Sequence, residues 1–70
     1  MISASQYEEW DAWAARLIYM VRAHDLGQIK SLHALEIALR NDRHNERFAD
    51  SDEERWYLVR RVREAKRLST

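Results

Sequence analysis

The stretch Val21-Arg22-Ala23-His24-Asp25-Leu26-Gly27-Gln28 holds the only glycine of the chain and separates two segments with helical periodicity. Before it, apolar side chains recur every three or four residues, as they do along one face of an α-helix. Because glycine readily adopts the left-handed conformation that ends many helices, Gly27 is the expected C-terminal cap. Ser5 and Glu8 have the spacing of a capping box at the other end. The sequence therefore predicts a helix over residues 6–25.

Two further helices are expected after this glycine. Leu32, Leu35 and Leu39 lie on one side of a helix over residues 29–43, and Ser31 is placed to cap its start. A second capping box, Ser51-Asp52-Glu53-Glu54, opens a helix over residues 52–68. Nothing in the sequence alternates as a strand does. We predict an all-α fold, with residues 1–70 forming one domain as a small bundle or helical array.

The length of the chain raises the question of how the fold is stabilised. A domain of 70 residues buries only about 60% of the surface that its unfolded chain exposes. The chain has no cysteine, which excludes disulfides and argues against a zinc site. The apolar face of the first helix is also wide and aromatic. We therefore expect a homodimer, with a compact monomer as the alternative, and place its interface at Trp10, Trp13, Leu17 and Met20.

The charges balance overall but are unevenly distributed. Twelve basic and twelve acidic side chains give a net charge of zero, which argues against a strongly basic coat for nucleic acid. Residues 55–70 nevertheless carry six basic groups and one acidic group. No segment has the roughly 20 apolar residues of a membrane span, and the acidic start lacks the pattern of a signal peptide. We expect a soluble, cytoplasmic protein that does not bind membranes.

The strongest functional pattern lies in the third predicted helix. Four residues fall at helical spacings that place them along one side: Trp56, Arg60, Arg63 and Arg67. Tryptophan and arginine are the residue types most enriched at binding hot spots, so this strip favours a protein partner. It could equally be a solvated helix face, or contact the phosphates of DNA or RNA. A helix-turn-helix reading of residues 23–40 is weak, because only Lys30 and Arg40 would be positive in its recognition helix.

Nothing in the sequence indicates catalysis. Three short helices rarely enclose a polarised pocket, no metal-ligand spacing is present, and one glycine cannot make a phosphate-binding loop. His24 is expected to be hydrogen-bonded at the edge of the core. We predict a non-enzyme without cofactor, metal or small-molecule substrate. The composition resembles that of small accessory proteins of phages and mobile elements, which implies regulation or inhibition of a host protein. A nucleic-acid-binding regulator that uses the third helix is the alternative.

Overall fold

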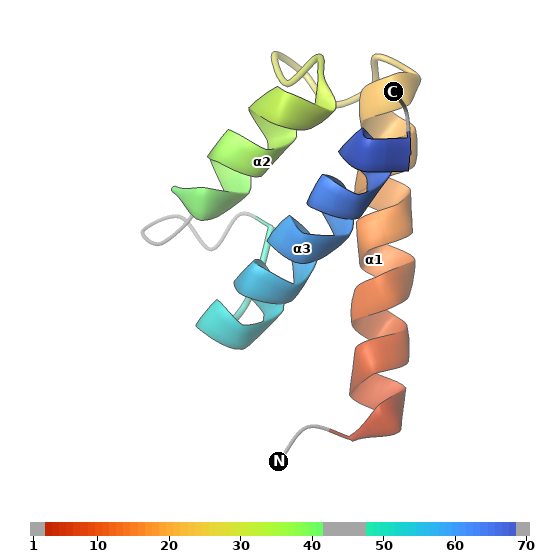
Figure 1. Ribbon diagram of the computed structural model, residues 1–70, viewed down its shortest axis with the longest axis vertical. Helices are drawn as coiled ribbons and strands as arrows, with labels where there is room; N and C mark the ends of the chain where they lie inside the picture. The colour runs from red at the N-terminus through yellow and green to blue at the C-terminus, as the bar shows by residue number, and fades with distance from the viewer. Residues whose placement is uncertain (1–2, 42–47, 69–70) are drawn as a thin grey trace.

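The computed structural model describes residues 3–41 and 48–68, and in these residues it contains three α-helices and no strand. The helices are α1 (Ala4–Arg22), α2 (Leu32–Arg40) and α3 (Asp52–Leu68). Figure 1 shows α1 and α3 running in the same direction, with α2 descending beside α3. The packing of α3 against both other helices makes it the central element. The predicted all-α fold with three helices is confirmed.

The start of α1 lies two residues earlier than predicted. Ser3, in an extended conformation, accepts a hydrogen bond from the backbone N–H of Gln6 through its Oγ, at 3.2 Å. Ser5 is already inside the first turn, so the predicted capping box of Ser5 and Glu8 is wrong. Two serines at alternate positions both satisfy the spacing rule, and the helix uses the earlier one. About half a turn of helix is thereby gained at the N-terminus.

The end of α1 is a Schellman motif built on a histidine instead of the glycine. The backbone N–H of Asp25 donates to the carbonyl of Met20 at 2.7 Å, and that of His24 donates to Val21 at 3.1 Å. His24 takes the left-handed conformation between them, with φ of 56°. Gly27, with φ of 59°, lies further on, in a turn closed by Ile29 N–H and the Leu26 carbonyl. Gly27 therefore shapes the connection, and the predicted helix end at residue 25 is corrected to Arg22.

This histidine gives a direct test of the helix end. Residues with a Cβ are strained at positive φ, and His24 is exposed, so its side chain contributes no core contact. We expect His24→Gly to raise the free energy of unfolding by about 0.5–1 kcal/mol, since glycine accepts this conformation without strain. Urea denaturation measures the change. Asp25→Gly, one residue later at a position without positive φ, is the control and should not stabilise the protein.

The other two helices begin at the predicted caps. Ser31 Oγ accepts from Ala34 N–H at 3.0 Å, so residues 29 and 30 lie outside α2 and the predicted span of 29–43 is too long. Ser51 Oγ accepts from Glu54 N–H at 3.1 Å. The Glu54 carboxylate accepts a hydrogen bond from the backbone N–H of Asp50 at 2.9 Å. In a capping box this bond usually comes from the N-cap residue itself, which here is Ser51, so the donor lies one residue earlier than usual. The predicted bounds of the third helix, 52–68, agree with α3.

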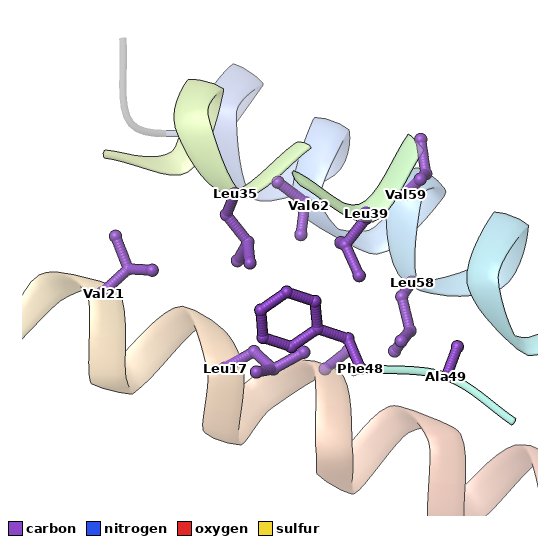
Figure 2. Packing of buried hydrophobic residues seen from close by; sticks show 10 residues of the cluster. Leu17, Val21, Leu35, Leu39, Phe48, Ala49, Leu58, Val59 and Val62 are labelled. Atoms are coloured by element: carbon purple, nitrogen blue, oxygen red, sulfur yellow. The ribbon is translucent and has the colours of Figure 1, made fainter. Parts of the chain in front are cut away.

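The core is formed where the three helices meet. Its fully buried side chains are Leu17, Leu35, Leu39, Leu58, Val59 and Val62. Figure 2 shows the ring of Phe48, from the segment before α3, inserted between α1 and the leucines of α2. Phe48 thus fills space in the core between the three short helices. The question of whether helix two continues through residues 42–47 lies outside the described residues.

The longest helix, α1, has 19 residues and carries charged side chains along its length. Across residues 3–41 and 48–68, no helix combines the length and the apolar character needed to cross a bilayer.

Candidate functional site

The predicted basic strip is only partly assembled on α3. Trp56 is 49% exposed, and Arg60 and Arg67 are exposed as well. Arg63 instead turns toward α2, where its Nε donates to the Glu36 carboxylate at 3.0 Å. The guanidinium of Arg60 lies over the ring of Tyr57, 5.5 Å from its centroid, and not over Trp56. The four residues share a helix side as predicted, but the guanidinium of Arg63 is already paired with Glu36 of the same chain.

The arginine that contacts Trp56 is its buried neighbour Arg55. The Arg55 guanidinium lies 4.9 Å from the centroid of the Trp56 ring. It donates through Nη1 to the carbonyl of Arg40 at 2.9 Å, and so satisfies a backbone acceptor at the end of α2. Its Nη2 pairs with Asp52 at 2.9 Å. Because Arg55 is held at these points, it supports the inner side of the Trp56 ring while the outer side stays exposed.

An aromatic cluster joins the first halves of α1 and α3. Tyr7 and Trp10 meet edge to face with centroids 5.7 Å apart, and Tyr57 lies 5.5 Å from Tyr7 and 5.7 Å from Trp10. The Tyr57 hydroxyl donates to Asp11 at 2.5 Å, and this bond together with burial raises the pKa of Tyr57. Asp11 also pairs with Arg61 at 3.2 Å. These contacts fix the aromatic rings against one another.

Two open depressions flank Trp56. The first has a volume of about 400 Å³ and is lined by Tyr7, Trp10, Glu53, Trp56, Tyr57 and Arg60. The second, of about 250 Å³, is lined by Ile37, Arg40, Asn41 and Trp56. Trp56 therefore forms a ridge between an aromatic hollow and a smaller hollow at the end of α2. We define the Trp56 surface by its apolar and basic members, which are the partly buried Tyr57 and the exposed Tyr7, Ile37, Arg40, Trp56 and Arg60.

The buried carboxylate of Glu36 organises the basic side chains between α2 and α3. Its side chain is 9% exposed and pairs with Lys66 at 2.9 Å, with Arg63 at 3.0 Å and with Arg40 at 3.8 Å. The hydrogen bond from Lys66, aided by Arg63, lowers the pKa of Glu36 against the opposing effect of burial. Sequence reasoning missed this group. Its signal was the presence of one acidic residue on the apolar side of the second helix.

The residues predicted at a dimer interface take part in the core of a single chain. Leu17 is 0% exposed and Trp10 is 7% exposed. Trp13 and Met20 are partly buried against the core, and the Trp13 indole donates to the carbonyl of Phe48 at 2.6 Å. The wide face of α1 is thus covered by α2, α3 and the Phe48 segment. The homodimer itself is untested by this single chain and stays a prediction.

The ionisable side chains form no arrangement of the kind that holds a metal. Among residues 3–41 and 48–68, no group of three or more histidine and acidic side chains is placed to bind one ion. His24 is exposed at the end of α1 instead of lying at the core edge. His33 is also exposed, with Nδ1 3.3 Å from Lys66. The described histidines therefore do not converge on a common site.

The described residues thus form three helices that carry a half-exposed tryptophan flanked by arginine. No protein-family model, curated protein or solved structure matches this chain.

Proposed function

We propose that this protein is a non-catalytic, cytoplasmic interaction module that regulates or inhibits a partner protein through the Trp56 surface. One observation carries the proposal: Trp56 stands half-exposed between two depressions, supported from below by Arg55. Exposed apolar patches rimmed by polar groups are typical of interaction sites. A rigid tryptophan beside arginine is also the usual composition of a binding hot spot.

The chemistry of the surface indicates the kind of partner segment that fits it. The aromatic hollow suits an apolar side chain, and Arg60 stands where it can pair with a carboxylate of that segment, as does the exposed Arg40, whose contact with Glu36 is long at 3.8 Å. Arg55 does not add to this charge, because it is buried and paired with Asp52. The proposed partner therefore presents an apolar side chain flanked by acidic residues. The accessory role in a phage or mobile element suggested by the composition is part of this proposal.

The charges of α3 favour a protein over DNA or RNA. Several of its basic side chains pair with carboxylates of the same chain, namely Arg55, Arg61, Arg63 and Lys66. Phosphate contacts supply most of the affinity for nucleic acid, and paired side chains contribute less to it. We expect no mobility shift of DNA or RNA at low salt. A complex that weakens steeply with added salt would support the nucleic-acid alternative instead.

Capture of a partner from a lysate of the source cell tests the Trp56 surface. The bait is the full chain, and the variant is Trp56→Ala with Arg60→Glu. We expect the captured protein to be lost by at least about tenfold, as for hot-spot residues. Lys30→Glu makes the same kind of charge reversal at an exposed position away from this surface and should capture normally.

Two measurements make this result interpretable. The circular dichroism spectrum should be unchanged in the variant and its melting temperature should fall by only a few degrees, because Arg60 is exposed and Trp56 is half-exposed. Equal capture by the variant and the natural chain would show that the Trp56 surface is not the contact. The predicted homodimer remains part of the proposal, but its contact has to lie outside Trp10 and Leu17, which are buried within one chain.

A further inference from the structure

The aromatic hollow beside Trp56 has a floor and two sides made of rings. It is the depression of about 400 Å³ to which α1 and α3 both contribute. Trp10, which is 7% exposed, forms its floor, whereas Tyr7 and Trp56 are 44% and 49% exposed and stand at its sides. Tyr57 contacts Tyr7 and Trp10, with ring centroids 5.5 and 5.7 Å away. The hollow therefore suits a ligand that gains from touching several aromatic rings at once.

The rings are held in place within the chain itself. The hydroxyl of Tyr57 donates to Asp11 at 2.5 Å, and the guanidinium of Arg55 lies 4.9 Å from the centroid of the Trp56 ring. A prearranged site is matched best by a ligand that is also rigid, because neither then loses much conformational entropy on binding. Among peptide segments, the polyproline II helix of a proline-rich stretch is the one that is preformed.

The chemistry of the rings favours proline over an organic cation. Aromatic faces carry partial negative charge, and the neutral proline ring packs flat against them through its weakly positive C–H groups. A cation would also be attracted to such faces, but the guanidinium of Arg60 already lies over Tyr57 and would repel it. Tyr7 and Trp56 also carry O–H and N–H donors, which can serve the backbone carbonyls that polyproline II leaves unpaired.

The charges beside the hollow match the length of a polyproline II turn. Glu53 and Arg60 both line the hollow, and a separation of seven residues along α3 spans about 10 Å. Polyproline II rises about 3.1 Å per residue with three residues per turn, so one turn spans about 9 Å. A segment with an acidic and a basic side chain three positions apart can therefore pair with Arg60 and Glu53 together.

We propose that the aromatic hollow binds a proline-rich segment of the partner in the polyproline II conformation, with an acidic and a basic residue three positions apart. The inference rests on the proposed function and names the class of segment that the Trp56 surface recognises. Proline supplies the apolar side chain expected in the hollow, and the acidic residue pairs with Arg60. The basic residue, opposite Glu53, is an additional requirement.

A synthetic peptide with the sequence Pro-Pro-Glu-Pro-Pro-Lys-Pro-Pro tests this inference on the full chain. In nuclear magnetic resonance titrations, the indole N–H signal of Trp56 should shift to saturation. The signal of Trp13 should stay in place, because its indole donates to the carbonyl of Phe48 and does not line the hollow. A peptide with alanine at every proline keeps both charges and should bind at least about tenfold more weakly.

Three variants of the chain locate the binding site. Tyr7→Ala removes one side of the hollow and should raise the dissociation constant of the peptide at least about tenfold. Tyr19→Ala is the matched control, since this tyrosine of α1 is 70% exposed and does not line the hollow. Arg60→Glu should weaken binding about tenfold and should prefer a peptide with lysine in place of glutamate. Because Arg60 is exposed, this variant keeps the test decisive if Tyr7→Ala disturbs the packing.

Three results would overturn the inference. They are a Trp56 signal that does not respond to the peptide, equal binding of the alanine peptide, and binding of tetramethylammonium at the hollow in preference to the peptide. If the Trp56→Ala, Arg60→Glu variant loses its partner while the natural chain ignores the peptide, only the proline class is wrong. If the peptide binds while both chains capture the partner equally, the proposed function is wrong instead. The two failures are therefore distinguishable.

Discussion

Replacing Leu17 with Ala should lower the free energy of unfolding by about 3 kcal/mol. Leu17 is 0% exposed and packs within a cluster formed by all three helices and Phe48. Truncation would remove three carbon atoms from a close-packed site and leave a cavity that the short helices can fill only by shifting. A small domain has little stability in reserve, so this loss should be visible as a large drop in melting temperature.

The way in which this loss of stability depends on protein concentration distinguishes two roles for Leu17, in the core of one chain or at an interface between two chains. If Leu17 belongs to the core of one chain, Leu17→Ala should destabilise the protein equally at low and high protein concentration. An effect that appears only where chains associate would instead support the interface predicted from sequence. Leu68→Ala provides the control, because it is the same substitution at a position that is 87% exposed. We expect it to change the free energy of unfolding of the monomer by less than about 0.5 kcal/mol.

The parts of the fold that depend on local signals were predicted well from sequence. The bounds of α3 follow from Ser51, whose side chain caps the helix, and from the acidic first turn. The start of α2 follows in the same way from Ser31. These signals act over three or four residues, so they are readable without knowledge of the rest of the chain. The end of α1 could not be predicted from such signals, because a histidine adopts the left-handed conformation that glycine usually takes.

Features that depend on how the helices meet could not be obtained in this way. Whether one chain covers Trp10 and Trp13 depends on Phe48 and on the direction of α3, and the sequence specifies neither locally. The commitment of Arg63 to Glu36 requires the antiparallel pairing of α2 and α3. The half-exposed Trp56 belongs to the strip predicted from sequence, but its contact with Arg55 was not predicted. The spacing of residues along one helix shows which of them share a side of that helix. It does not show which residues of the other helices that side contacts.

The largest electrostatic effect is expected at Glu36. Glu36→Gln removes a carboxylate that is 9% exposed and that accepts charged hydrogen bonds from Arg63 and Lys66. Charged hydrogen bonds at a nearly buried acceptor contribute more than surface pairs, although the exposure of both cations reduces the effect. We expect the free energy of unfolding at pH 7 to fall by about 2 kcal/mol. Glu64→Gln, which removes a half-exposed partner of Arg61, should cost less than about 0.5 kcal/mol.

The pH dependence of this difference identifies its cause. The Lys66 hydrogen bond lowers the pKa of Glu36 in the folded chain, so the folded state favours the ionised carboxylate. Its contribution should be complete above the ordinary carboxyl pKa and should be lost as the pH falls through the lowered pKa. Urea denaturation should therefore show the natural chain and Glu36→Gln converging in stability as the pH falls through this lowered pKa, because a protonated glutamate resembles glutamine. A gap of constant size from neutral to acid pH would show that Glu36 acts through its shape and not through its charge.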